Sequence, residues 1–234
     1  MRLTVLGCNG PYPAAEGACS GYLLESGGTR VLLDCGTGVL ARLTAFVPPE
    51  ELDAVVLTHL HYDHMSDMLP LIYRCQAVGK RLKVFFPMQE NPLCDLLRAG
   101  YDTADIAAGG CVGAIALAAL PVRHPVPAYA VRLTDVEGKS LCYTGDTNTR
   151  PGLAQFAQGA DVLLADACFT DALWDEKKPH LSARLAAILA REAGTKQLVL
   201  THFRPDIDRQ TLLREARQEY AAASMAQIGL RLAW

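Results

Sequence analysis

The stretch that decides the fold is Thr58-His59-Leu60-His61-Tyr62-Asp63-His64, whose last six positions hold three imidazoles and one carboxylate. Before it runs an apolar segment, residues 54–57, whose length and branched side chains predict a short buried strand. After it, apolar residues from Met68 to Cys75 recur with helical spacing. The sequence therefore predicts a loop between the end of a strand and the start of a helix.

The cluster of polar side chains in this loop predicts a metal site. A single histidine at such a place is commonly a surface residue, but four such groups in one loop are improbable by chance. Imidazole and carboxylate suit zinc and similar divalent ions. The H-x-H-x-D-H pattern of His59, His61, Asp63 and His64 resembles the signature of the metallo-β-lactamase-fold hydrolases. The resemblance implies their fold and a metal-dependent hydrolysis, and it names no substrate.

Length and composition predict one domain spanning residues 1–234, because half of the residues are hydrophobic and supply an ample core. The net charge of −3 provides no overall basic field for a polyanion. The first residues lack the apolar core of a signal peptide, and no run approaches the ~18 apolar residues of a membrane span. None of the eight cysteines forms a C-x-x-C pair, which favours reduced thiols. We therefore expect a cytoplasmic protein without membrane contact.

The pattern of apolar residues and turn signals predicts strands alternating with helices in both halves of the chain. Strands are expected at residues 1–6, 22–25, 30–34, 54–57, 82–86, 112–122, 129–133, 140–144, 162–165, 198–200 and 230–232. Helices are expected at 39–43, 68–78, 92–98, 182–193 and 209–222, whereas 101–110 gives no clear pattern. This order favours an α/β fold of two mixed sheets packed face to face with helices outside. It is the αββα sandwich that the resemblance implies.

Three further positions match the family in order and local pattern. His124 lies in Pro-Val-Arg-His-Pro, Asp146 in Tyr-Thr-Gly-Asp-Thr, and His202 follows an apolar strand. The resemblance implies two divalent ions, zinc or alternatively manganese or iron, with a shared hydroxide as nucleophile. The implied ligands are His59, His61 and His124 for one ion, Asp63, His64 and His202 for the other, and Asp146 bridging both.

A further pair resembles the tRNase Z branch and its phosphodiesterase relatives. Asp166 directly follows the predicted strand 162–165, and His180 precedes the helix that begins near Ser182. In that branch, an acidic residue orients a histidine that protonates the leaving group. The implied catalytic residues are thus Asp63, Asp166 and His180. The branch usually has Glu where this chain has Asp166, so contact with His180 is either direct or through water. The alternative is that Asp166 caps a turn and His180 is an exposed loop residue.

The chain departs from the tRNase Z enzymes where those enzymes grip tRNA. His124 and Asp146 are only 22 positions apart, room for one hairpin and not for a long inserted arm. The lysines and arginines form no cluster of five or more, although Arg123, Arg150, Lys177, Lys178 and Arg204 lie near predicted site residues in sequence. A folded RNA needs many phosphate contacts. A small phosphodiester is therefore the expected substrate, and RNA ends stay possible.

Several alternatives stay open on sequence alone. The enzyme alternatives are a tRNA 3′-processing endoribonuclease and a thioester or lactone hydrolase of the glyoxalase II kind. A non-catalytic binding scaffold is the third, although such proteins usually have broken ligand sets. Asp34 is either a second contact to the metal loop or a strand-end residue bonded to turn amides. The chain is either a monomer or a homodimer.

Overall fold

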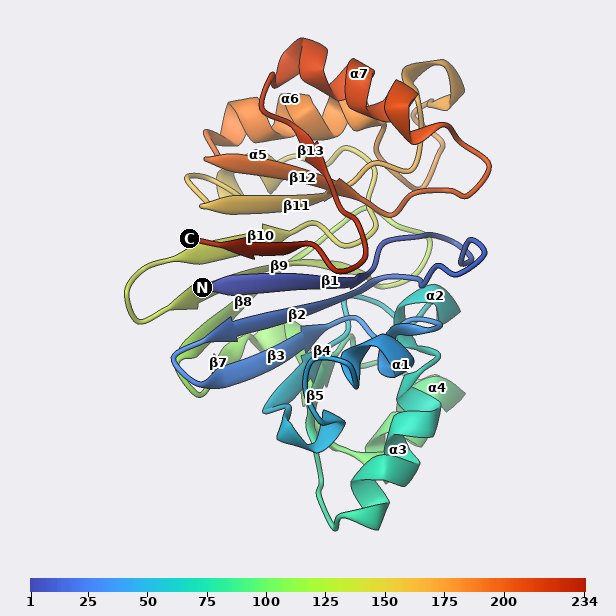
Figure 1. Ribbon diagram of the computed structural model, residues 1–234, viewed down its shortest axis with the longest axis vertical. Helices are drawn as coiled ribbons and strands as arrows, with labels where there is room; N and C mark the ends of the chain where they lie inside the picture. Colours follow the sequence, from blue (N-terminus) through green and yellow to red (C-terminus); the bar gives the residue numbers. More distant parts are fainter.

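The computed structural model describes residues 1–234 and contains two seven-stranded sheets packed face to face with helices on both outer faces (Figure 1). The first sheet has the order β14-β1-β2-β3-β4-β5-β6, and the second has the order β13-β12-β11-β10-β9-β8-β7. The predicted αββα sandwich of two mixed sheets is therefore confirmed.

The boundaries follow the predicted pattern closely. The first sheet contains β1 (Arg2–Gly7), β2 (Gly21–Ser26), β3 (Thr29–Leu33), β4 (Ala54–Val56), β5 (Lys83–Phe86), β6 (Asp102–Asp105) and β14 (Arg231–Ala233). The second contains β7 (Gly110–Val112), β8 (Ile115–Pro121), β9 (Tyr129–Asp135), β10 (Ser140–Tyr143), β11 (Val162–Asp166), β12 (Gln197–Thr201) and β13 (Ser224–Met225). The helices are α1 (Val39–Leu43), α2 (Tyr62–Met65), α3 (Met68–Ala77), α4 (Pro92–Gly100), α5 (Leu153–Phe156), α6 (Ala183–Ala193) and α7 (Arg209–Glu219).

The sequence of a strand that is buried on both faces is a continuous apolar run, and β3 is an example. Its Val31 and Leu33 belong to the core between the sheets, whereas Leu32 packs in the core beneath α1, α3 and α4. Successive side chains of a strand point to opposite faces, so one strand serves both layers. On the other side of the molecule, α6 and α7 cover the second sheet (Figure 1).

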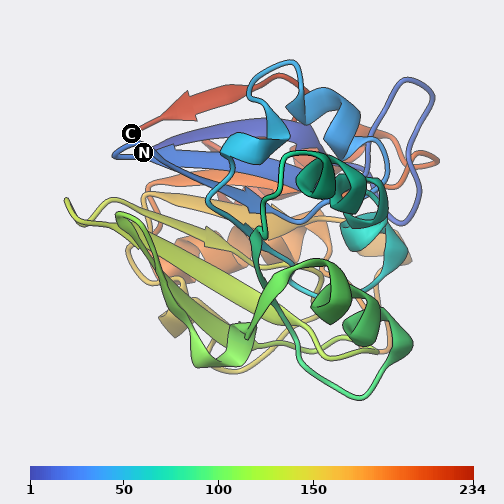
Figure 2. The ribbon, with the colours of Figure 1, turned by 90° about the horizontal axis from the view of Figure 1, so that it is seen from below.

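The parallel strands place their carboxyl ends at one edge of the sandwich. β3, β4, β5 and β6 are parallel neighbours in the first sheet, and β10, β11, β12 and β13 are parallel neighbours in the second. α2 lies at the edge where β4 ends, and the chain termini lie together at the opposite edge (Figures 1 and 2). In open α/β sheets, ligands bind beyond the carboxyl ends of parallel strands. The edge beside α2 is therefore where a site is expected.

Some elements differ from the prediction. The single helical turn α2 occupies residues 62–65, which were predicted to be loop, because one turn is too short to show a helical period. The predicted strand 112–122 is divided into β7 and β8 by a turn in which Gly113 has a positive φ of 52°. β6 lies in the region without a clear pattern, and α5 and β13 were not predicted. No helix combines the length and apolar character that crossing a membrane requires.

Candidate metal centre

The predicted ligands come together at this edge although they lie far apart in sequence. Each of them lies at or just beyond the carboxyl end of a strand, where the scaffold is rigid and the chain turns. His59 and His61 follow β4, Asp63 and His64 lie in α2, His124 follows β8, Asp146 follows β10, and His202 follows β12.

One group consists of His59, His61, His124 and Asp146, whose ligand atoms all lie within 4.8 Å of one another. Nδ1 of His61 is 3.0 Å from Nε2 of His59 and 3.0 Å from Nε2 of His124. Burial lowers the pKa of His59 and His61, and it lowers the pKa of His124 to about 4. All three imidazoles are therefore neutral near pH 7 and offer nitrogen lone pairs to a cation.

The second group consists of Asp63, His64, Asp146 and His202, again within 4.8 Å. Oδ2 of Asp146 is 3.2 Å from Nε2 of both His64 and His202, and Oδ2 of Asp63 is 3.2 Å from Nε2 of His202. Asp146 belongs to both groups. Burial by itself would raise the pKa of Asp146, but His202 and His64 outweigh it and hold that pKa well below its usual value. The shared residue is thus an ionised carboxylate.

Three buried atoms of the ligand residues lack a hydrogen-bond partner, namely Nε2 of His64, Oδ1 of Asp146 and Nδ1 of His202. A buried polar atom left unpaired costs about 1–3 kcal/mol, so such atoms normally have a partner. A divalent cation held at these groups would satisfy Nε2 of His64 and Oδ1 of Asp146. The nitrogen and oxygen donors are also those that zinc and similar ions prefer. The residues present therefore fit a divalent metal.

The backbone around His202 is arranged to hold its imidazole in place. His202 has a φ of 60°, a conformation that side chains other than Gly, Asn and Asp seldom adopt and that often marks functional sites. A Cβ atom on Gly10 would lie 1.9 Å from Nε2 of His202. The amide of Gly10 donates to the carbonyl of Phe203, which keeps the two segments in register. Glycine at position 10 thus lets the backbone lie directly against the ligand.

Asp34 is the partner that orients His64, which resolves the question that the sequence left open. Oδ2 of Asp34 is 2.7 Å from Nδ1 of His64 and also accepts from the hydroxyl of Tyr143 at 2.9 Å. The amide and hydroxyl of Thr58 donate to the same carboxylate. A carboxylate that accepts from one ring nitrogen leaves the other nitrogen as the lone pair for a metal.

Replacing Asp34 with asparagine should therefore weaken metal binding by about 10- to 100-fold, the usual cost of losing such a partner. Asn tolerates the left-handed backbone that Asp34 adopts, so the fold should persist. Competition with a chelator at fixed pH measures the affinity. Asp53→Asn, which neutralises a carboxylate that accepts from the Arg30 amide away from the site, is the control. Equal affinities for the Asp34→Asn variant and the parent would show that Asp34 does not orient the ligand.

Asp166 and His180 are in direct contact, so no water bridges them. His180 is also not an exposed loop residue. Oδ2 of Asp166 is 2.8 Å from Nδ1 of His180, and the His180 side chain and backbone together are only 9% exposed. The amides of Thr147 and Cys168 also donate to Asp166 and fix its orientation. The ring of His180 stacks on that of His202 with centroids 4.8 Å apart. Nε2 of His180 therefore faces away from Asp166 beside the metal groups.

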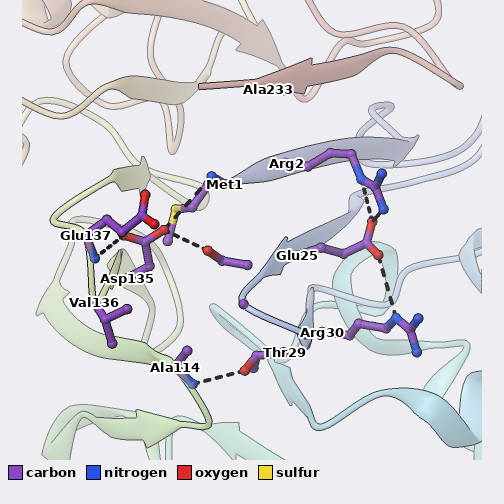
Figure 3. A pocket seen from close by; sticks show the side chains of 13 residues that line it. Met1, Arg2, Glu25, Thr29, Arg30, Ala114, Asp135, Val136, Glu137 and Ala233 are labelled. Atoms are coloured by element: carbon purple, nitrogen blue, oxygen red, sulfur yellow. Dashed lines mark hydrogen bonds and ion pairs between the residues drawn. The ribbon is translucent and has the colours of Figure 1, made fainter.

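Two cavities differ in their relation to this centre. One of about 190 Å³ adjoins His180 and is lined by Pro11, Tyr12, Cys168, Phe169, Pro179, His180 and Arg204. A larger cavity of about 590 Å³ is lined by residues at both chain termini, among them Met1 and Ala233 (Figure 3), and the termini lie at the edge opposite α2 (Figure 1). Among its charged side chains, Glu25 lies between Arg2 and Arg30 and pairs with both. It contains no predicted site residue, so size alone does not mark the site.

The five basic residues near the site in sequence do not all form one patch. Lys178 and Arg204 lie over the ring of Phe169. Arg123 instead donates to the backbone carbonyl of Glu176, and Arg150 lines a separate cavity beside α6. Lys178 and Arg204 are thus the basic residues next to the cavity at His180, and each has a carboxylate partner, Asp175 at 3.8 Å and Asp206 at 2.6 Å.

The fold and this centre define the class of a metal-dependent hydrolase with the metallo-β-lactamase fold. Residues 29–203 match the family model of the Beta-lactamase superfamily domain, and the chain belongs to this family. It is 35% identical over 212 residues to the probable metallo-hydrolase YhfI of Bacillus subtilis strain 168, a match that covers 86% of each chain. The crystal structure of YhfI superposes with a TM-score of 0.94 at 31% identity and covers 99% of both chains.

The chain is also similar to proteins that carry the names ribonuclease Z or tRNase Z. A protein of Methanopyrus kandleri named ribonuclease Z is 29% identical over 269 residues, covering 98% of this chain and 96% of its own. Human tRNase Z, short form, has a TM-score of 0.81 at 20% identity, covers 100% of this chain and 99% of its own, and thus shares the fold. Membership of a metallo-hydrolase family and the two ligand groups together support divalent metal binding.

Proposed function

We propose that this protein is a dinuclear metal-dependent phosphodiesterase that acts on small phosphodiesters or RNA ends. The observation that carries the proposal is the direct contact between Asp166 and His180 beside Asp146, with Nδ1 of His180 only 3.8 Å from Oδ2 of Asp146. An alkoxide leaving group needs a proton, and an oriented imidazole supplies one. A thiolate departs without that help, so thioester hydrolysis gives His180 no role.

The roles of the residues follow from their positions. His59, His61 and His124 would hold one ion, Asp63, His64 and His202 would hold the other, and Asp146 would contact both. Bound zinc, or alternatively manganese or iron, polarises phosphoryl oxygens and lowers the pKa of water.

The chain's own residues supply the proton and its positioning. Asp166 holds Nδ1 of His180, so that Nε2 donates a proton to the departing oxygen. Asp63, which we assign to the catalytic set, keeps His202 in position through its 3.2 Å contact.

A small substrate fits this chain better than a folded tRNA. β9 and β10 form a short hairpin in the segment between His124 and Asp146, where an inserted arm would be expected. The match to the M. kandleri ribonuclease Z spans 269 positions, more than the 234 residues of this chain, so that relative has insertions which this chain lacks. The contributions of phosphate contacts to the affinity for a polyanion multiply. A protein that makes six to ten such contacts changes its affinity by ~10³–10⁵ over a modest salt range, and a chain with few contacts lacks this contribution.

Metal analysis of the purified protein followed by a substrate panel tests the proposal. We expect two transition-metal ions per chain, and a higher kcat/KM on bis-p-nitrophenyl phosphate or a cyclic nucleotide than on a thioester. Accurate and efficient cleavage of a 3′-extended tRNA at physiological salt would instead establish a tRNA-processing endoribonuclease. A preference for the thioester, or protein without metal after metal-supplemented expression, would contradict the phosphodiesterase assignment.

A further inference from the structure

The cavity that Arg150 lines, here named the α6 cavity, has apolar walls and lies apart from the metal centre. Its volume is about 350 Å³, within the range of typical ligand pockets, and no predicted metal ligand lines it. One face of α6 forms one wall with Leu185, Ile188 and Leu189, and Leu153 of α5 belongs to the opposite wall. Leu185 and Ile188 are only partly buried, so the chain itself leaves this apolar wall uncovered.

Arg150 is the only basic residue of the α6 cavity, and no group of the chain pairs with it. Its Nη1 is buried without a hydrogen-bond partner. Every other arginine of the chain has a hydrogen-bond, ion-pair or aromatic partner. A buried donor without an acceptor is unfavourable, so such donors normally have one. An anionic acceptor that lies in the cavity meets this need.

The topology separates the two charged ends of the α6 cavity. α5 and α6 connect the parallel strands β10, β11 and β12, so both helices run from the edge of the metal centre back to the opposite edge. Arg150 precedes α5 and therefore lies towards the metal centre. Glu192, the other charged residue of the cavity, lies at the end of α6, where the amide of Gly159 donates to the carbonyl of Ala193. The cation and the anion thus lie at opposite ends, with apolar walls between them.

We propose that the α6 cavity binds a small amphiphilic monocarboxylate, with its carboxylate at Arg150 and its unbranched alkyl tail along α6. The guanidinium group matches the geometry of a carboxylate. From Leu185 to Glu192 the helix rises by about 10 Å, which suits a tail of medium length. Leu181, which also lines the cavity, directly follows His180, so the occupant packs against the segment that carries this histidine.

The two charges of the cavity select against other anions. One guanidinium balances one negative charge, whereas a phosphate monoester carries about −1.5 to −2 near neutral pH. Glu192 at the far end repels a second carboxylate on the tail. A fatty monocarboxylate therefore fits better than an alkyl phosphate or a dicarboxylate.

Calorimetric titration of the metal-loaded protein with butanoate, hexanoate and octanoate tests this site. Each added methylene that the cavity buries should raise the affinity about fourfold. We expect 1-octanol to bind more weakly than octanoate, because it brings no charge to Arg150. Octanedioate should also bind more weakly, because its second carboxylate meets Glu192. No binding of octanoate, or equal affinities for octanoate and 1-octanol, would overturn the proposal.

Variants connect the binding to the cavity. Arg150→Gln should weaken octanoate about 10- to 150-fold, the contribution of a hydrogen bond to a charged group, and leave the affinity for 1-octanol unchanged. Glu192→Gln should tighten the binding of octanedioate. Arg98→Gln changes the net charge equally by removing an exposed arginine of α4 that pairs with Asp95, and it is the control. An octanoate affinity that Arg150→Gln leaves unchanged would mean that the carboxylate binds elsewhere, such as at the metal ions, and would refute the site.

Discussion

The Asp146→Ala variant should lose both metal ions and nearly all turnover while keeping its fold. Asp146 is the one residue that belongs to both ligand groups, so its removal takes an oxygen from each of them. Metal ions contribute several kcal/mol of transition-state stabilisation, and each 1.36 kcal/mol is a factor of ten in rate. We therefore expect turnover to fall by about 10³-fold or more.

The fold should survive because the Asp146 carboxylate stabilises no strand pairing. Its Oδ1 has no hydrogen-bond partner, and its Oδ2 faces only histidines of the site. Metal content, turnover and circular dichroism are measured on the same preparation. Asp161→Ala is the matched control, since it removes another buried aspartate, paired with Lys196, from the opposite end of β11. That variant should lose stability but keep its metal, and wild-type metal content in Asp146→Ala would refute the bridging role.

Features of the chain whose sequence pattern is local are predicted well. The spacing of His59, His61 and His64 lies within one loop, and the strands around it are apolar runs that are easily recognised. Asp146 and His202 carry little local signal. Only their position after strands, in the order that the family resemblance implies, marks them as ligands.

Contacts between the two sheets cannot be predicted from such local patterns, because the residues in contact lie far apart in sequence. Tyr143 donates to Asp34 over a separation of 109 residues, and its ring packs edge-on against Tyr22 at 5.2 Å. Both tyrosines read from sequence as ordinary apolar strand residues. Their hydroxyl groups face polar partners only because the sheets pack with a particular register. The cations beside Phe169 are similar, since α6 and its preceding loop bring Lys178 there and the loop after β12 brings Arg204.

The His180→Ala variant should lose about 10²- to 10⁴-fold in rate on a phosphodiester with an alkyl leaving group, the usual contribution of a general acid. The loss should be much smaller on bis-p-nitrophenyl phosphate, because p-nitrophenolate departs readily without a proton. Metal content should stay at the parent's level, since His180 is not among the seven residues assigned to the ions, although its ligand atom lies within 4.8 Å of those of Asp146 and His202. The measurement is the ratio of kcat/KM on the two substrates.

The control for this variant separates proton donation from disruption of the loop. Ser182 lies two residues beyond His180 and caps α6, because its hydroxyl accepts from the amide of Leu185. The Ser182→Ala variant removes this cap. Loss of such a cap costs about 1 kcal/mol of stability, and it should not change the ratio between the two substrates. A loss in His180→Ala that is equal on both substrates would mean that His180 positions the substrate. A loss confined to the alkyl ester requires that His180 supplies the proton, because only that substrate needs one.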